Sequence, residues 1–364
     1  MNVKELLKKY SKPENFINRD LSWVEFNKRV LEEALNPELP LLEKIKFISI
    51  FCSNLDEFYM IRISGIKEQI AANVEEPSID GLTPIEQLRK IEKALKPLLK
   101  NLDNYWMDYI TPALKENNIK LLSFNDISEA DKAKLTEYFK KEVYPVLTPL
   151  AFDPGRPFPY ISNLSLSLAI LIRKPNGENH FARVKVPSIL PRLLQIDNIL
   201  EPKKSSGVNG NFTATFIWLG DLIKANLHLL FPGMEIVEAH RFRITRDTDI
   251  ELQEDEADDL LRVIEENIKQ RRFGSVVRLE VGHPVPDFML DTLIDNLQIT
   301  KDDVHVSDGP LGLSDVMGLF KLPLHQLKEK PYYPITPKVF EEEEDIFSII
   351  RQKDILLHHP YHSF

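Results

Sequence analysis

The residues best suited to chemistry lie in a helix predicted over residues 40–74. Its apolar residues recur at helical spacing and share one face: Phe47, Ile50, Phe51, Phe58 and Ile61. Asn54 falls on that face and interrupts it. Burying an amide with its hydrogen-bonding groups unpaired costs about 1–3 kcal/mol, so Asn54 needs a partner. That partner is either a neighbouring protein group or a polar ligand, in which case Asn54 lies at the mouth of a binding site.

Charged residues flank Asn54 in the same helix. Asp56 and Glu57 could bind a metal ion or act as acid and base, although the solvated flank of a helix has the same residue types. Arg62 could bind phosphate oxygens through its planar guanidinium, or form a salt bridge within the protein. The residues alone leave both alternatives open.

Three histidines near the carboxyl end, His358, His359 and His362, have an order that suggests zinc binding. Pro360 separates them, so two of them cannot lie one helical turn apart, and no glutamate accompanies them as a general base. We therefore predict no metal site in this chain.

Composition indicates a globular chain with two or three domains. The chain has 364 residues, 28% of them charged, and a formal net charge of −10; its mean hydropathy is −0.23. These values disfavour a membrane protein, a disordered chain and a nucleic-acid coat. A single cysteine, Cys52, excludes an intrachain disulfide framework. We expect a cytoplasmic protein, with peripheral membrane association as an alternative. The sequence contains no Walker-type phosphate loop, no Gly-rich dinucleotide motif and no serine elbow.

The first third of the chain is predicted to be all-helical. Apolar periodicity indicates helices over 20–35, 40–74 and 84–117. Ser22 and Glu25 have the spacing of a capping box, which would place the start of the first helix there.

The middle of the chain is predicted to be a mixed α/β (α+β) domain. We expect strands over 163–173, 180–187, 212–218, 235–246 and 276–281, and helices over 129–144, 221–230, 254–272 and 287–297. The composition of residues 201–211 is typical of a loop. The last residues, DILLHHPYHSF (354–364), have the pattern of a buried strand at which the chain stops, so we expect a truncated domain there.

Several segments resemble one family, bacterial polyphosphate kinases that work through a phosphohistidine. The resemblance rests on NRDLSWVEFNKRVLEEA (18–34), SNLDEFYMIRISGI (53–66), LTPLAFDPGRPFPYISNLSLSLA (147–169), FRITRDTDIELQEDEADDLL (242–261), RRFGSVVRLEV (271–281), PLGLSDVM (310–317) and DILLHHPYHSF (354–364). It runs from about residue 18 to the end of the chain.

The resemblance implies a multidomain architecture. A helical N-terminal domain (1–118) would precede a head domain that mediates dimerisation (119–334). Residues 335–364 would then form a linker and the first strand of a C-terminal catalytic domain with a phospholipase-D-like fold. The implied reaction is reversible transfer of the terminal phosphate of ATP to inorganic polyphosphate, with Mg²⁺ bound mainly by the C-terminal half. The implied assembly is a homodimer or a tetramer.

The resemblance also assigns site residues. Asn54, in the motif SNLDEF, matches an asparagine that the family's N-terminal domain contributes to the ATP site, and Arg62 is a weaker candidate on the phosphate side. The phosphohistidine would lie beyond Phe364, so this chain carries no catalytic histidine and is expected to be inactive alone.

Two other functions are consistent with parts of the sequence. One is a non-catalytic scaffold or dimerisation module that binds an anionic partner. The other is an unrelated helical adaptor, which would require the motif matches to be accidental.

Overall fold

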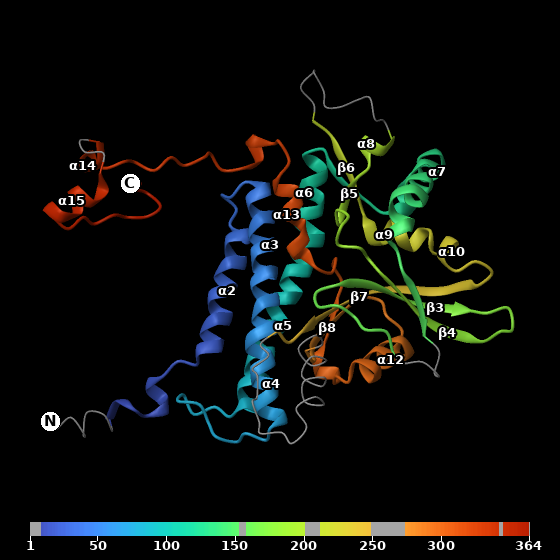
Figure 1. Cartoon of the computed structure of the whole chain (residues 1–364), viewed down its shortest axis with the longest axis horizontal. Helices are drawn as coiled ribbons and strands as arrows, with labels where there is room; N and C mark the ends of the chain where they lie inside the picture. Colours follow the sequence, from blue (N-terminus) through green and yellow to red (C-terminus); the bar gives the residue numbers. More distant parts are fainter. Residues whose placement is uncertain (1–8, 153–157, 201–211, 249–273, 342–344, 364) are drawn as a thin grey trace. The chain divides into compact units, whose positions relative to one another are not determined.

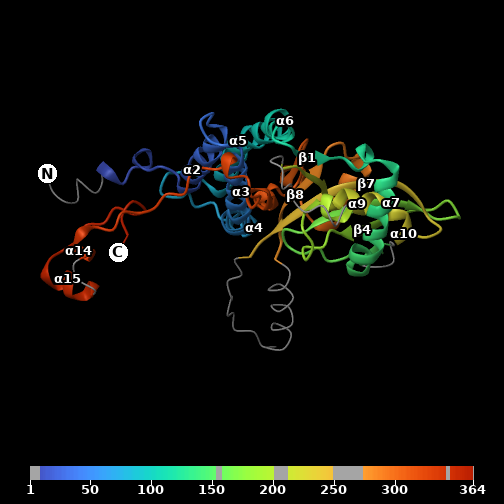
Figure 2. The same ribbon diagram turned by 90° about the horizontal axis from the view of Figure 1, so that it is seen from above.

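The computed structural model describes residues 9–152, 158–200, 212–248, 274–341 and 345–363. The loop expected over 201–211 and the helix expected over 254–272 lie outside the described residues. The chain forms two compact units, Met1–Leu322 and Pro323–Phe364. The larger unit contains a group of helices and a region of strands and helices (Figures 1 and 2).

Long helices dominate the first part of the larger unit. They are η1 (Pro13–Asn15), α2 (Arg19–Leu35), α3 (Leu41–Phe58), α4 (Ser64–Ala71), α5 (Pro84–Tyr105) and α6 (Thr111–Glu116). Two π-helical turns, η2 (Tyr59–Ile63) and η3 (Trp106–Ile110), join α3 to α4 and α5 to α6. The helices predicted over 40–74 and 84–117 are therefore confirmed as continuous helical segments, and each contains one π-helical turn.

The first helix begins earlier than the sequence suggested. Asn18 is its N-cap, and its side-chain oxygen accepts hydrogen bonds from the backbone N–H groups of Asp20 and Leu21. The capping box expected at Ser22 and Glu25 is wrong, because Ser22 already lies inside the helix, where its backbone N–H donates to the Asn18 carbonyl. Helix α2 packs against both α3 and α5, and each of the three helices contributes buried apolar residues.

A six-stranded sheet follows, with the strand order β2-β4-β3-β7-β8-β9. Its strands are β2 (Pro149–Phe152), β3 (Leu166–Arg173), β4 (Asn179–Lys185), β7 (Glu235–Arg246), β8 (Val276–Gly282) and β9 (Val304–Ser307). All neighbours are antiparallel except β8 and β9. A smaller sheet has the order β1-β6-β5, with strands β1 (Ile119–Leu122), β6 (Ala214–Trp218) and β5 (Leu193–Gln195).

Helices cover both faces of the large sheet. The α-helices of this region are α7 (Glu129–Tyr138), α8 (Asp197–Leu200), α9 (Leu219–Ala225), α10 (Leu227–Leu230), α12 (Asp287–Leu297) and α13 (Met317–Phe320). Shorter turns are η4 (Phe124–Asp126), η5 (Phe139–Val143), η6 (Tyr144–Val146), η7 (Lys301–Asp303) and η8 (Leu313–Val316). One apolar core joins β3 and β4 to α7 and α9, and another joins β7 and β8 to α12. The predicted mixed α/β region is confirmed.

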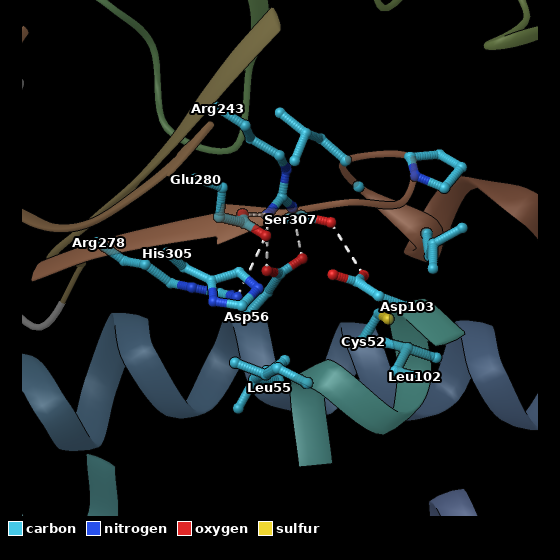
Figure 3. A pocket seen from close by; sticks show the side chains of 15 residues that line it. Cys52, Leu55, Asp56, Leu102, Asp103, Arg243, Arg278, Glu280, His305 and Ser307 are labelled. Carbon is cyan, nitrogen blue, oxygen red and sulfur yellow. Dashed lines mark hydrogen bonds and ion pairs between the residues drawn. The ribbon is translucent and has the colours of Figure 1, made fainter. Parts of the chain in front are cut away.

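Alternation along β7 and β8 places charged residues on one side of this sheet. Phe242 and Ile244 belong to the core with α12, whereas Arg243 lies between them on the opposite face. Arg243 is paired in register with Glu280 on β8, which shares its face. That polar part of the sheet faces helix α3 and η2 (Figure 3).

The smaller unit contains η9 (His325–Leu327), α14 (Lys338–Glu341) and α15 (Ile346–Gln352). The strand expected over residues 354–364 is not formed in residues 354–363, the part of that range that the structure describes. Its one pairing is an isolated bridge between Ile335 and His362, and Leu356 is 94% exposed. A strand needs a neighbouring ladder to satisfy its backbone and cover its side chains, and the described residues of this unit contain none.

Candidate functional site

A groove with a volume of about 510 Å³ lies along the first turns of α2 and the end of α3. Its lining residues come from α2, α3 and η2: Arg19, Asp20, Ser22, Trp23, Phe26, Asn54, Glu57, Phe58, Ile61 and Arg62. Both residues that the sequence singled out for ATP binding, Asn54 and Arg62, lie in this groove. The two helices lie side by side, so residues far apart in the chain form one wall.

Asn54 is held by a second asparagine. Its Nδ2 donates to Oδ1 of Asn27 at 3.1 Å, and Nδ2 of Asn27 donates to the carbonyl of Phe51 at 3.1 Å. Asn27 is 1% exposed, whereas Asn54 is half-buried. Within the described part of the chain, this contact leaves Oδ1 and the second Nδ2 hydrogen of Asn54 without a protein partner. Asn54 thus has both a protein partner and free hydrogen-bonding groups at the groove.

Asn27 was missed by the sequence reasoning, although a signal existed. It interrupts the apolar face of α2, just as Asn54 interrupts the face of α3, because Val24, Leu31 and Ala34 around it are all buried. Two polar side chains within the apolar faces of neighbouring helices can hydrogen-bond to each other, as Asn27 and Asn54 do.

Aromatic rings form a flat part of the groove. Trp23 and Phe58 stack with ring centroids 4.0 Å apart and an interplanar angle of 4°. Phe26 also lines the groove and is 47% exposed. Phe58 is only 2% exposed and Trp23 is half-buried, so the rings that a planar, partly apolar ligand group can reach are those of Trp23 and Phe26.

Arg62 forms a salt bridge and also lines the groove. Its Nε and Nη2 contact the two carboxylate oxygens of Asp20 at 2.8 and 3.3 Å. Asp20 is 4% exposed and also accepts a hydrogen bond from Gln87. The Arg62 side chain is 37% exposed. A ligand phosphate could contact Nη1, which takes no part in the contacts with Asp20.

The structure separates Asp56 from Glu57. Glu57 is exposed in the groove, whereas Asp56 is buried on the side of α3 that faces the sheet. Adjacent residues on a helix point about 100° apart. The two carboxylates therefore do not form a paired acid–base or metal site.

Asp56 instead belongs to a buried ionic cluster between α3 and the sheet (Figure 3). Arg243 donates through Nη1 and Nη2 to Asp56 at 2.8 and 2.5 Å, and through Nη1 to Glu280 at 2.6 Å. Arg278 lies 3.2 Å from the other oxygen of Glu280. Burial opposes ionisation of Glu280, but Arg278 and Arg243 outweigh it and lower its pKa to about 2. Burial and the nearby Arg278 lower the pKa of His305 to about 4.

The other residues around this cluster are structural. Burial raises the pKa of Cys52, so its thiol stays protonated and unreactive. Asp103 on α5 accepts hydrogen bonds from the Ser307 hydroxyl at 2.9 Å and from the Asp308 backbone N–H at 3.1 Å. The cavity there is only about 30 Å³, which is too small for a substrate.

The histidines near the carboxyl end are held by local contacts. The backbone N–H of His358 donates to Nδ1 of His362 at 3.2 Å, and the His358 ring packs on Tyr361. Within the described ranges, no three His, Cys, Asp or Glu side chains come close enough to hold a metal ion. No helix in those ranges is long and apolar enough to cross a membrane.

Comparison with known proteins places these features in a family. Residues 16–122 match the model of the polyphosphate kinase N-terminal domain, and residues 130–319 match that of the polyphosphate kinase middle domain. The chain is 48% identical over 358 residues to polyphosphate kinase 1 of Chlorobaculum tepidum, covering 97% of this chain and 50% of the relative. It is 47% identical over 358 residues to the polyphosphate kinase of Prosthecochloris aestuarii, covering 98% of this chain and 49% of the relative.

A solved structure agrees with these matches. The crystal structure of polyphosphate kinase from Porphyromonas gingivalis is similar to this chain with a TM-score of 0.75 and 26% identity. The similarity covers 96% of this chain and 48% of that one. The chain thus spans about half the length of the relatives it matches, and it belongs to the polyphosphate kinase family.

Proposed function

We propose that this chain supplies the ATP-facing wall of an enzyme that reversibly transfers the terminal phosphate of ATP to inorganic polyphosphate. One observation carries the proposal: the Asn54 amide is fixed by Asn27 at the edge of a groove and keeps hydrogen-bonding groups free. Family membership supplies the reaction class, because the curated relatives are named polyphosphate kinases.

The groove is suited to positioning a nucleotide. Asn54 offers one N–H and one carbonyl oxygen, Trp23 and Phe26 offer an aromatic surface, and Arg62 offers a guanidinium on the phosphate side. Phosphoryl transfer depends mainly on alignment of the reacting groups and on stabilisation of charge. A residue that orients ATP therefore contributes to the rate without taking part in a covalent step.

The covalent chemistry is proposed to occur outside this chain. Among the described residues, the groove lining contains no histidine. We infer that the phosphohistidine expected for this family lies beyond Phe364 and would split the transfer into two steps. The described residues do not bring together a ligand set for Mg²⁺. We therefore assign magnesium binding to the nucleotide phosphates and the catalytic half.

The remaining parts have proposed structural roles. Residues 1–118 would form the helical domain that carries the nucleotide-facing groove, and 119–334 the head domain through which two chains associate. Residues 335–364 would lead into the catalytic half. In this arrangement the chain acts as a scaffold and as one wall of the ATP site.

The test is the Asn54→Ala change in the full enzyme. Loss of one neutral hydrogen bond to ATP should raise KM for ATP, and so lower kcat/KM, about three- to tenfold. Initial rates of polyphosphate formation would be measured against ATP concentration at saturating Mg²⁺.

The matched control is Ser53→Ala, which changes an exposed neighbour on the same helix that does not line the groove. Both variants should melt within a few degrees of the wild type. Equal kcat/KM for ATP in all three proteins would contradict the proposal and would favour the scaffold alternative.

A further inference from the structure

Asn54 and the buried ionic cluster lie on the same short stretch of α3. Asp56 follows Asn54 by two residues, and the two side chains leave the helix on different sides, one toward the groove and the other toward the sheet. Figure 3 shows Arg243 reaching from its strand to Asp56 on the helix. Any rotation of α3 about its axis therefore moves both side chains together.

The contact between Arg243 and Asp56 is directional. Both oxygens of Asp56 are bonded to the two terminal nitrogens of one guanidinium, and Arg243 is itself oriented by Glu280. The side chains of Arg243, Asp56 and Glu280 are 5%, 9% and 10% exposed. A two-point contact in a rigid fork fixes the angle as well as the distance between its partners.

Asn27 on α2 also bonds to α3, through the Phe51 carbonyl and the Asn54 amide. The remaining contacts of α3 fix its orientation less tightly. The helix packs on α2, η8 and α13 through apolar side chains such as Phe51 and Leu55. Ser49 donates a hydrogen bond to the carbonyl of Ser314, about two turns before Asp56. Apolar packing is non-directional. A rotation of 20° would move a group at the helix surface by about 2 Å, given the radius of an α-helix with its side chains.

We propose that Arg243, acting through Asp56, is a positioning residue that holds the Asn54 amide in the orientation required for ATP. The proposal rests on the function proposed above for Asn54. It assigns a role in the nucleotide site to a residue of the strand region, 187 residues from Asp56 in the chain. Buried ion pairs add little net stability but can specify one geometry among several.

The decisive variant replaces the pair with apolar side chains, Arg243→Met together with Asp56→Leu. It removes one cation and one anion, and Glu280 keeps its contact with Arg278. No uncompensated buried charge results, so the protein should stay folded. In the full enzyme we expect KM for ATP to rise about three- to tenfold, as in Asn54→Ala, with kcat within about twofold of the wild type.

A mutant cycle separates positioning from a general structural effect. If Arg243 acts through Asn54, adding Asn54→Ala to the apolar pair should raise KM no further. If the KM increases caused by Asn54→Ala and by the Arg243→Met/Asp56→Leu variant multiply, the proposal is overturned. A wild-type KM in the Arg243→Met/Asp56→Leu variant would also overturn it. The control is Lys100→Met with Asp308→Leu, which removes another ion pair between a helix and the strand region but does not involve α3. It should leave KM for ATP unchanged.

A second measurement tests the geometry without any enzyme activity. In this chain labelled with ¹⁵N-asparagine, the side-chain amide signals of Asn54 and Asn27 should shift in the apolar pair and stay in place in the Lys100/Asp308 control. Unshifted signals in the apolar pair would overturn the positioning role, even if Asn54→Ala had shown that Asn54 binds ATP. If the signals shift in the apolar pair but Asn54→Ala leaves KM for ATP unchanged, the proposed function is rejected while the positioning of Asn54 by Arg243 stands. If the apolar pair does not fold, Arg243→Lys, which keeps the charge but loses the fork, provides the same comparison.

Discussion

Within the ionic cluster, the charge of each side chain is balanced by that of its neighbours. Two carboxylates, Asp56 and Glu280, face two guanidiniums, Arg243 and Arg278. His305 adjoins them and lies opposite Glu280 in the β8–β9 register. A protonated imidazole would add an uncompensated charge to this balanced set. Burial lowers the pKa of His305, and the positive charge of Arg278 lowers it further.

The His305 environment predicts a pH dependence of stability. In the unfolded chain this histidine takes up a proton near pH 6.5, but in the folded chain only near pH 4. Between these values the unfolded state binds more protons, so the free energy of unfolding must fall as the pH falls. The shift corresponds to a loss on the order of 3 kcal/mol over that window. Urea unfolding of this chain at several pH values between 7 and 4.5 measures it.

The His305→Gln variant isolates this contribution. Glutamine is neutral throughout the range, so the variant should lose less stability than the wild type on acidification. Groups away from the ionic cluster titrate equally in both proteins, so the difference between the two curves reports His305 and its coupling to Glu280. Parallel curves would show that His305 titrates alike in the folded and unfolded states.

Residue types alone could identify Asn54 but not its surroundings. An amide inside an apolar stripe shows that a partner exists, and the structure provides Asn27. For Arg62 the sequence left a salt bridge and a phosphate contact open, and the structure shows the salt bridge with Asp20. The burial of Asp56 could not be predicted, because its partner Arg243 is 187 residues away and no local pattern links them.

At the scale of elements, the start of α2 positions much of the groove. Arg19, Asp20, Ser22 and Trp23 all lie in its first turns. These turns depend on the Asn18 cap, whose oxygen accepts from two backbone N–H groups at 3.0 and 2.9 Å. Fraying there would displace the aromatic surface and the Asp20–Arg62 pair together.

The Asn18→Ala variant should therefore cost about 1–2 kcal/mol of stability, in the range found for loss of a good N-cap. Thermal or urea unfolding of this chain measures the loss. Asn18→Ser keeps a side-chain acceptor at the cap and is the control, with an expected cost of a few tenths of a kcal/mol. Equal losses in the two variants would mean that packing around Asn18, rather than the cap, stabilises this end of the helix.

Long periodic elements were predictable, and short or irregular ones were not. The strands β3, β4, β6, β7 and β8 and the helices α2, α3, α5, α7 and α12 fall close to their predicted ranges. The strands β1, β2, β5 and β9 have three or four residues each, too few to show a period. The π-helical turn η2 also has no sequence period of its own, yet it carries Ile61 and Arg62 into the groove.

At the scale of the whole molecule, the groove that we propose faces the nucleotide has no candidate phosphohistidine in its described lining. The ten lining residues include no histidine, cysteine or lysine. Arg62 is already bonded to Asp20, and Glu57 is the other carboxylate in the lining. The role that we propose for this groove is to orient ATP, and its described lining has no histidine that could accept the phosphoryl group.

We therefore expect this chain alone to form no polyphosphate and to acquire no label from ATP carrying ³²P in its terminal phosphate. Light scattering on the same sample gives its mass, and a dimer would agree with association through the head domain. The full enzyme, run in parallel with Mg²⁺, is expected to show acid-labile label of the kind that phosphohistidine gives, because the nucleophile is proposed to lie beyond Phe364. Acid-labile label on this chain by itself, followed by turnover, would place a nucleophile among its nine histidines. Because no histidine is in the described lining of the groove at Asn54, the phosphoryl group would then be accepted elsewhere in the chain.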